Sequence, residues 1–268
     1  MSFWKQSWQE TSKRGKRIII ISALIIFLYI TFIRPLSKFM SFGEPEGFIF
    51  EDTKSMGYQK IEPTPGVEIT EMLLDVPFIH QLKHSPLVNG CEVTSLAMVL
   101  NHYHIEVNKN TLADELEHVP LTYESGLKGD PNQGFVGSMT DEVMAMGVFV
   151  PPIERLAQEY VPDHLQVVAS TQTDLNTLLK QVAIGNPIWV IATLDFETPT
   201  DDDFIPWKTP TGDYLVTPLI HSGVIVGFDE QNIYVNDPLY AKNRAIDRDQ
   251  FEATFNKMGK QSLYLTEK

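Results

Sequence analysis

The only cysteine of the chain, Cys91, follows an Asn-Gly turn and opens a helical pattern of apolar residues in the stretch NGCEVTSLAMVLNHY, residues 89–103. A cysteine in the first turn of a helix lies near unpaired backbone N–H groups and the positive end of the helix dipole. Both favour the thiolate, which is the nucleophilic form of the side chain. A lone cysteine is also commonly a small buried hydrophobic residue. The position of Cys91 favours a nucleophile over this second interpretation.

A thiol nucleophile needs a general base, and one of the seven histidines is well placed to supply it. His221 begins the β-rich run HSGVIVGF, and Asp237 ends the next such run, NIYVND. In a hairpin these two ends lie together, so Cys91, His221 and Asp237 can serve as nucleophile, base and orienting carboxylate. Asp237-Pro238 is also a common way for a strand to end, so each residue alone is weak support.

The register of the predicted hairpin decides whether His221 and Asp237 can meet. A four-residue tip, 229–232, pairs Phe228 with Ile233 and places the two polar side chains on opposite faces of the sheet. A three-residue tip, or a β-bulge, restores the parity that puts them on the same face. The sequence leaves both registers open, and a catalytic triad requires the second.

Metal and nucleic-acid sites find little support in the sequence. His80 and His84 have i,i+4 spacing, but Pro86 and nearby turn residues argue against a regular helix, and no further ligands follow at recognisable spacing. We therefore expect no metal and no cofactor. The chain has 21 Lys and Arg against 35 Asp and Glu, a net charge of −14, which disfavours nucleic acid as a partner.

Helical patterns precede strand patterns along the chain, which predicts an α+β fold with an antiparallel sheet. A short strand is expected over residues 73–79. Helices are expected from Cys91, from a cap at Asn110 or Thr111, from the capping-box pattern at Ser138–Asp141 to Met146, and over Thr173–Ile184. Later strands are expected in the runs PIWVIATL, HSGVIVGF, NIYVND and SLYL.

The N-terminal region predicts a membrane anchor. Residues 1–17 are a basic tail, and residues 18–34 hold an uncharged apolar run closed by an arginine, with no small-residue cleavage site after it. The positive-inside rule then keeps the tail cytoplasmic and makes the chain a single-pass protein of the cell membrane with an extracellular domain. A cleaved signal peptide is the alternative. Residues 35–71 are expected to form a stalk or linker, and 72–268 the domain.

Four motifs follow one another along the chain, namely Gln81 with NGCEVTSL, GDPNQGFVG at residues 129–137, HSGVIVGF, and NDP at residues 236–238. With these motifs, residues 72–265 resemble the bacteriocin-leader-peptidase-like branch of the papain superfamily. Many members of that branch are stand-alone, exported or membrane-anchored proteins of Gram-positive bacteria. The resemblance implies a papain-like fold, with an N-terminal helical half carrying the nucleophile helix and a C-terminal antiparallel sheet half.

The resemblance also implies a role for each matched residue. Cys91 matches the nucleophile, His221 the base, and Asp237 the residue that orients the base. Gln81 matches the glutamine whose side-chain amide lines the oxyanion hole, although it lies farther from Cys91 than in many papain-like enzymes. Glu92 stands where many relatives have Gly. Its charge could raise the thiol pKa, or its side chain could point to solvent.

The implied function is a membrane-anchored extracytoplasmic cysteine peptidase, which cleaves a peptide or isopeptide bond of a peptide or cell-surface protein through a thioester on Cys91. The alternative is a catalytically silent papain-like module for binding or assembly at the cell surface. An iodoacetamide-type probe separates them, because only an active thiolate labels fast and depends on His221. The sequence leaves open the substrate, hydrolysis versus acyl transfer, and whether residues 129–137 form a lid.

Overall fold

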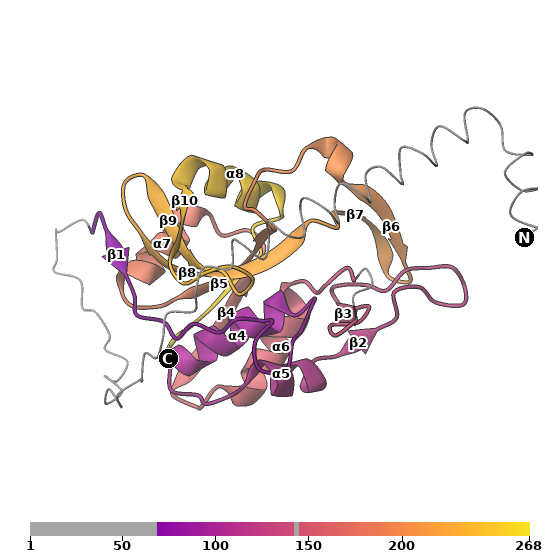
Figure 1. Ribbon diagram of the computed structural model, residues 1–268, viewed down its shortest axis with the longest axis horizontal. Helices are drawn as coiled ribbons and strands as arrows, with labels where there is room; N and C mark the ends of the chain where they lie inside the picture. The colour runs from indigo at the N-terminus through magenta and orange to yellow at the C-terminus, as the bar shows by residue number, and fades with distance from the viewer. Residues whose placement is uncertain (1–68, 142–144) are drawn as a thin grey trace, which may run out of the picture. The chain divides into compact units, whose positions relative to one another are not determined.

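A seven-stranded antiparallel sheet is the centre of the computed structural model, which describes residues 69–141 and 145–268 (Figure 1). Its strands are β1 (Met72–Leu73), β4 (Leu165–Ser170), β5 (Ile188–Thr193), β8 (Ile220–Phe228), β9 (Asn232–Asn236), β10 (Arg244–Asp247) and β11 (Ser262–Glu267). They follow the order β10-β9-β8-β5-β11-β4, and β1 pairs with the end of β8. The predicted antiparallel sheet is therefore confirmed.

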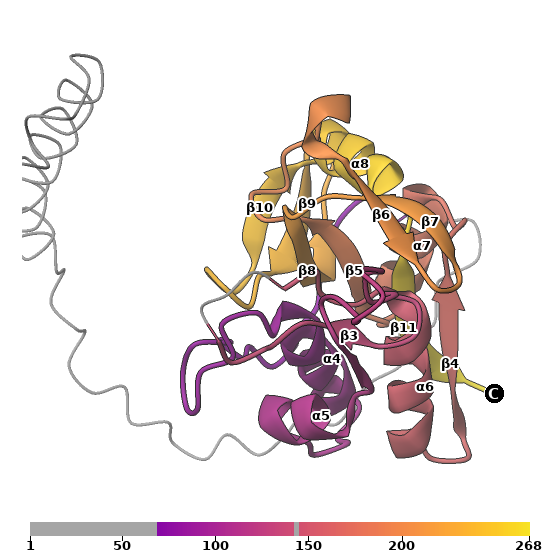
Figure 2. The ribbon, with the colours of Figure 1, turned by 90° about the vertical axis from the view of Figure 1, so that its right-hand side faces the viewer.

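The α-helices of the described residues pack around this sheet. They are α4 (Cys91–His102), α5 (Lys109–Glu115), α6 (Val150–Tyr160), α7 (Leu175–Ala183) and α8 (Arg248–Lys257). In Figure 1, α4, α5 and α6 lie below the sheet and α8 lies above it, and Figure 2 shows α6 beside β4. α4 packs on β5 and β8, and α8 packs on β5, β9 and β10. Because β5 is covered on both faces, its sequence IWVIAT is wholly buried and apolar at all but the last position.

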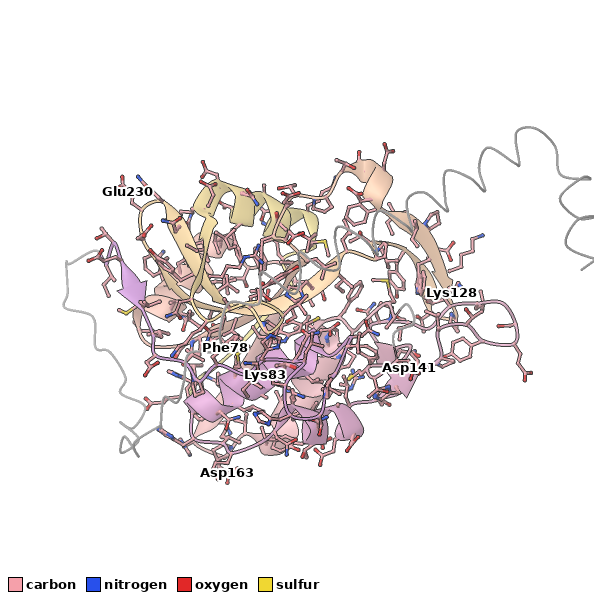
Figure 3. The ribbon with its side chains drawn as sticks, in the orientation of Figure 1. Phe78, Lys83, Lys128, Asp141, Asp163 and Glu230 are labelled. Atoms are coloured by element: carbon pink, nitrogen blue, oxygen red, sulfur yellow. The ribbon has the colours of Figure 1, made fainter. Side chains whose placement is uncertain are left out.

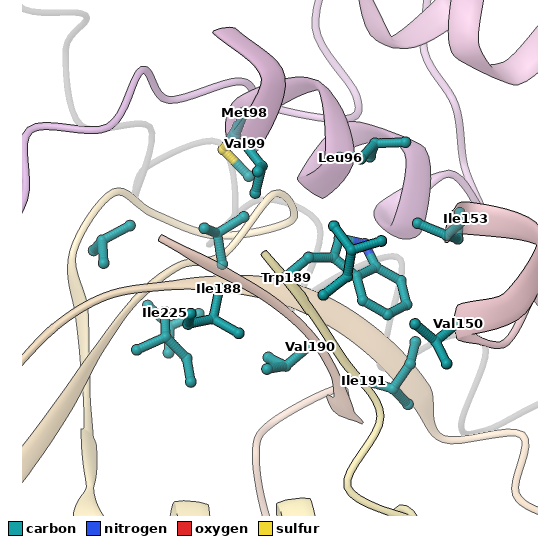
Figure 4. Close-up of a cluster of buried hydrophobic side chains, with 14 of the residues drawn as sticks. Leu96, Met98, Val99, Val150, Ile153, Ile188, Trp189, Val190, Ile191 and Ile225 are labelled. Atoms are coloured by element: carbon teal, nitrogen blue, oxygen red, sulfur yellow. The ribbon is translucent and has the colours of Figure 1, made fainter. Parts of the chain in front are cut away.

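A buried tryptophan ties the nucleophile helix to the sheet. Trp189 on β5 lies on the side that faces α4, near the fully buried Leu96 (Figure 4). Its indole Nε1 donates a hydrogen bond of 3.0 Å to the backbone carbonyl of Glu92. A buried indole N–H needs such a partner, so this bond fixes the first turn of α4 on the sheet. The residue that opens that turn is Cys91.

Two of the predicted helices form close to their expected bounds. α4 begins at Cys91 as predicted, and α7 lies within the predicted range. The cap of α7 is Asp174, whose side chain accepts a bond from Thr177 N–H, and the helix ends before Gly185, which has a φ of 103°.

The second predicted helix begins earlier than expected. The cap of α5 is Asn108, whose side chain accepts bonds from the N–H groups of Asn110 and Thr111. These two residues therefore lie inside the first turn, and the prediction that one of them is the cap is wrong. The error arises because Asn, Ser and Thr are all good caps, so a run of them marks a helix start only approximately.

The helix predicted over residues 138–146 is not formed by the described part of that segment. Residues 139–141 form bends and residues 138, 145 and 146 are not helical, while residues 142–144 lie outside the described residues. The Ser138 hydroxyl still accepts a bond of 3.2 Å from the backbone N–H three residues on. The local capping interaction is thus present without helical turns.

The expected order of helices first and strands last is wrong in detail. β4 precedes α7, and α8 lies between β10 and β11, so helices and strands interleave. The sequence prediction omitted α6, α8, β4 and β10, and the strand expected over residues 73–79 shortens to β1. Two small sheets were also not expected. They join β2 (His118–Val119) to β3 (Phe135–Val136), and β6 (Ile205–Thr209) to β7 (Gly212–Val216).

The predicted tail, anchor and most of the stalk fall within residues 1–68, which lie outside the described residues. Across residues 69–141 and 145–268, no helix has both the length and the apolar character needed to cross a membrane. The prediction of an anchor over residues 18–34 therefore stays a prediction.

Candidate active site

A β-bulge sets the register of the β8–β9 hairpin. Phe228 pairs with Ile233 across a four-residue tip, which by itself would put His221 and Asp237 on opposite faces. The pairing then shifts by one residue at Val226, after which β8 and β9 pair in the other parity. His221 and Asp237 therefore share a face, as a triad requires.

The tip itself is closed by an aspartate. Asp229 accepts bonds from the backbone N–H groups of Gln231 at 2.8 Å and Asn232 at 2.6 Å, and from the Tyr234 hydroxyl at 2.6 Å. The Tyr234 bond and these backbone bonds lower the pKa of Asp229 to about 2. An ionised Asp229 thus favours the four-residue tip, one of the two tip lengths that the sequence left open.

His221 and Asp237 form a buried hydrogen-bonded pair. His221 Nε2 lies 2.8 Å from Asp237 Oδ1, and both side chains are almost wholly enclosed. With Nε2 as the donor to the carboxylate, Nδ1 is left to accept a proton from another group. This is the arrangement that a general base and its orienting carboxylate need.

Asp237 is held on its other side by Arg244, a residue that the sequence analysis missed. Arg244 Nη1 donates to Asp237 Oδ2 at 2.8 Å, and the backbone N–H of Leu239 donates to Oδ1 at 3.0 Å. Burial alone would raise the pKa of Asp237, but the bonds from His221 and Arg244 outweigh it and lower that pKa. The guanidinium lies 5.4 Å above the ring of Phe196, so an aromatic ring and a carboxylate both hold it.

Cys91 opens α4 and lines a small cavity of about 130 Å³. Only 7% of its surface is exposed, so the thiol at the head of this helix is buried. Gln81 and His221 line the same cavity, so three of the four predicted site residues meet there. The fourth, Asp237, is bonded to His221. The walls also include Glu92, Leu194, Pro218 and Ile220.

Glu92 does not point to solvent. Its side chain is buried, and its Oε2 accepts a hydrogen bond of 3.1 Å from the Cys91 thiol. Its other oxygen, Oε1, accepts a bond of 3.1 Å from the backbone N–H of Val148. The family difference noted at this position thus places a carboxyl group directly beside the sulfur.

The surroundings of the thiol outweigh the expected effect of the helix N-terminus. Burial, and then the charge and hydrogen bond of Glu92, raise the pKa of Cys91 well above its usual range. Backbone hydrogen bonds with Ser222, next to His221 on β8, and with Cys91 itself lower this pKa but are outweighed. The backbone at the start of α4 thus favours the thiolate as expected, but desolvation of the thiolate is the larger effect in this state.

A glycine makes room for the Glu92 carboxyl. Gly147 has a φ of 80°, and a Cβ added there would overlap Glu92 Oε1. Glycine is the residue that meets both demands, since other residues rarely adopt this φ and all of them carry a Cβ. The segment before α6 is thus built to receive the carboxyl group.

Gln81 lies at the cavity, but its amide group is engaged elsewhere. Gln81 Nε2 donates to the carbonyl oxygens of Leu87 at 3.2 Å and Val88 at 3.0 Å. Its Oε1 is buried and has no hydrogen-bond partner among the described residues. Donation to an oxyanion would require Nε2 to turn away from these carbonyls, so the predicted role of Gln81 stays a prediction.

The extra loop between Gln81 and Cys91 is held by a lysine from α5. The buried Lys109 donates from Nζ to the carbonyl oxygens of His84 and Ser85, both of which have positive φ angles. His84 is therefore part of a strained turn, and His80 Nδ1 accepts a backbone bond within the same loop. In the described parts of the chain, no cluster of His, Cys, Asp and Glu could hold a metal ion.

Residues 129–137 are built into the domain as a turn cluster. The buried Asp130 accepts bonds from the backbone N–H of Asn132 at 2.8 Å and from the Thr211 hydroxyl. Trp207 Nε1 donates to the Gly129 carbonyl at 2.7 Å. A Cβ at Gly129 would overlap a neighbouring backbone oxygen, so close backbone packing requires glycine there. Of the two sequence interpretations, these contacts favour a structural turn over a lid.

The comparisons with known proteins agree on one family. The matching family model is described as the Peptidase_C39 like family and covers residues 73–263. The uncharacterized protein YvpB of Bacillus subtilis strain 168 is 46% identical over 192 residues, which are 72% of this chain and 75% of that protein. The crystal structure of a proposed C39-like peptidase from Bacillus anthracis matches with a TM-score of 0.70 and 35% identity, over 74% of this chain and 98% of that chain. A double glycine motif protease of an AMS/PCAT transporter, solved with its leader peptide, is 17% identical with a TM-score of 0.40, over 74% of this chain and 96% of that chain; this likeness is too distant to support an argument.

Proposed function

This chain belongs to the Peptidase_C39-like family, and on that premise we propose that it is a cysteine peptidase with Cys91 as nucleophile, His221 as base and Asp237 as the residue that orients the base. Family membership suggests the peptidase function. The observation that supports the residue roles is the 2.8 Å bond between His221 and Asp237 at a wall of the cavity that Cys91 lines.

The reaction that fits these residues passes through a thioester. His221 Nδ1 takes the thiol proton as Cys91 Sγ attacks the carbonyl carbon of the substrate bond. The tetrahedral oxyanion collapses to the thioester as His221 gives its proton to the leaving amine. Water then attacks the thioester, and its proton returns through His221 to the sulfur as the carboxylic acid leaves. An amine in place of water would give acyl transfer through the same intermediate.

The proposed oxyanion hole combines the backbone N–H of Cys91 with the side-chain amide of Gln81. Support for this role is the place of Gln81 at the cavity and the unpartnered Oε1 of its amide, which leaves the group less firmly held than a fully bonded one. The packing of α4 on β5 and β8 also supports the papain-like arrangement, in which nucleophile and base come from opposite halves of the domain.

We propose in addition that residues 18–34 anchor the chain in the cell membrane, with the peptidase domain outside the cell. The support is the apolar run, the basic residues before it and the absence of a small-residue cleavage site after it. Protease added to intact protoplasts should then digest the domain and spare the tail. Protection of the domain, or a released form that begins near residue 38, would contradict the anchor.

A catalytically silent binding module is the second candidate, and the burial of the Cys91 thiol favours it. Cells with Cys91→Ala should shed fewer or longer fragments of surface proteins than wild-type cells if the chain is a peptidase. Iodoacetamide should label the wild-type chain faster than His221→Ala, and Cys91 is the only thiol that can react. Identical shed proteins together with labelling that is independent of His221 would favour the binding module.

A further inference from the structure

The thiol of Cys91 has an acidic partner that no role proposed above uses. Glu92 Oε2 lies 3.1 Å from Cys91 Sγ, and Glu92 is 1% exposed. Moving a carboxylate out of water costs free energy unless partners compensate, so a buried carboxylate beside the sulfur is an unusual arrangement. The held geometry, with Val148 N–H on one oxygen and Gly147 leaving space beside it, shows that the position is fixed.

Several elements face Glu92, and each brings a particular charged or polar group near it. α4 contributes Cys91, and β8 contributes His221, whose charge acts on Glu92. The segment before α6 contributes the Val148 N–H, and the loop before α4 contributes the neutral Gln81 and Asn89 to the cavity. β5 has the sequence IWVIAT and contributes no charged side chain, and its Trp189 indole bonds to the backbone of Glu92.

Behind this group, Asp237 and Arg244 neutralise each other. A protonated His221 can therefore be balanced by one negative charge nearby, either on the Glu92 carboxylate or on the Cys91 sulfur. Two negative charges 3.1 Å apart in a site closed to water are strongly disfavoured. The carboxylate and the thiolate thus compete for the same place.

We propose that Glu92 is a further catalytic residue, whose protonation decides when the sulfur of Cys91 becomes a nucleophile. This rests on the proposed role of Cys91 as nucleophile. As a carboxylate, Glu92 accepts the thiol hydrogen bond and keeps the sulfur neutral. When Glu92 has taken up a proton from solvent, its carboxyl group donates a hydrogen bond to the sulfur instead, and the thiol proton passes to His221. The S–H bond then breaks, an N–H bond forms on His221 Nδ1 and the negative charge passes to the sulfur.

The burial of the Glu92 carboxyl group and the Cys91 thiol supports a coupling between their protonation states. The pKa of Glu92 is raised by burial, and the pKa of Cys91 is raised by burial and by the charge of Glu92. Groups that interact this closely titrate as a pair, so changing one must alter the titration of the other. If Glu92 served only to hold the Val148 N–H, replacing its carboxylate with a neutral amide would leave the reactivity of Cys91 unchanged.

The substitution Glu92→Gln separates these two roles. Gln keeps the size of the side chain and an oxygen for Val148 N–H, and it places an N–H donor beside the sulfur. We expect iodoacetamide to label the full-length Glu92→Gln chain at least about 10-fold faster than wild type at neutral pH, which corresponds to a thiol pKa lower by about one unit. Glu230→Gln, on the exposed β8–β9 tip (Figure 3), is the matched control and should label as wild type does. Equal rates and equal pH profiles for Glu92→Gln and wild type would overturn the proposal.

A second measurement covers the case in which Glu92→Gln fails to fold. The ¹³C chemical shift of the Glu92 carboxyl group, followed against pH in wild type and in Cys91→Ala, should titrate at a higher pH once the thiol hydrogen bond is lost. An unchanged titration would also overturn the proposal. Failure of the proposed peptidase function gives a different result, since shed surface proteins would then be unaffected by Cys91→Ala while the coupling between Glu92 and Cys91 remained measurable.

Discussion

Arg244 lies 2.8 Å from Asp237 on the side of the carboxylate opposite to His221. The buried carboxylate of Asp237 is therefore bonded from β8 by His221 and from β10 by Arg244. Asp237 follows β9 and Arg244 opens β10, which pairs with it. The geometry gives the orienting carboxylate a fixed charge and a fixed direction. A carboxylate that only rotated freely against His221 would supply neither.

Replacing Arg244 with Ala should leave Asp237 buried with one oxygen unpaired. We expect a loss of about 2 kcal/mol in the free energy of unfolding, measured in urea, because a charged hydrogen bond is removed. Labelling of Cys91 by iodoacetamide should also slow. The control is Arg155→Ala, which removes an ion pair to Glu117 that is largely exposed and should cost under about 1 kcal/mol. Equal losses in the two variants would mean that Arg244 does not hold Asp237.

The bulge at Val226 gives a second prediction. Deleting Val226 removes the unpaired residue of β8 but leaves Gly227 opposite Tyr234 and Ile225 opposite Val235, so His221 and Asp237 should stay on the same face of the sheet. We expect Cys91 labelling in this deletion to remain dependent on His221. Deleting Glu230 also shortens the hairpin by one residue, but at the exposed tip, and is the matched control. Loss of the dependence on His221 in the Val226 deletion alone would contradict our assignment of the bulge.

Much of this hairpin was predictable from sequence, because two apolar runs separated by turn residues are a local signal. The parity of its register was not. A three-residue tip and a four-residue tip with a β-bulge both place His221 and Asp237 on one face of the sheet. Which of the two forms depends on tertiary and loop bonds such as those of Asp229. The helices α4 and α7 were also found from local signals, α4 from its apolar periodicity and α7 from the Gly185 and Pro187 that follow it.

The helix α8 was missed because its sequence RDQFEATFNK is mostly polar and buries only Phe251, Thr254 and Phe255. In the site, the sequence motifs identified Cys91, His221 and Asp237, but neither the bond of Arg244 to Asp237 nor the burial of Glu92 beside the thiol. The bond of Arg244 to Asp237 joins two strands, and the burial of Glu92 depends on a glycine far along the chain. Such tertiary contacts leave no periodic pattern to read.

Substituting Gly147 with Ala tests the space reserved for Glu92. The variant should lose stability for two reasons, the positive φ at this position and the overlap of the new Cβ with Glu92 Oε1. Gly126→Ala is the matched control, because Gly126 has a φ of 83° and nothing within 4 Å of an added Cβ. We expect Gly126→Ala to cost about 1 kcal/mol from the φ angle alone and Gly147→Ala to cost more, as measured by urea unfolding. Equal costs would show that the Glu92 carboxyl is free to move aside.

The pH dependence of stability should report the burial of Glu92. Its pKa is raised in the folded state, so its contribution to stability is fully present below its unfolded pKa of about 4.3 and is lost as pH rises through the folded value. Asp237 acts in the opposite sense, but it does so equally in wild type and in Glu92→Gln, so the difference between these two proteins isolates Glu92. We expect the urea midpoint of wild type to fall relative to that of Glu92→Gln as the pH is raised from about 4 to 8, while Glu230→Gln stays parallel to wild type. A constant difference between wild type and Glu92→Gln across this range would mean that Glu92 ionises in the folded chain as it does in the unfolded one, and that burial imposes no cost on its charge.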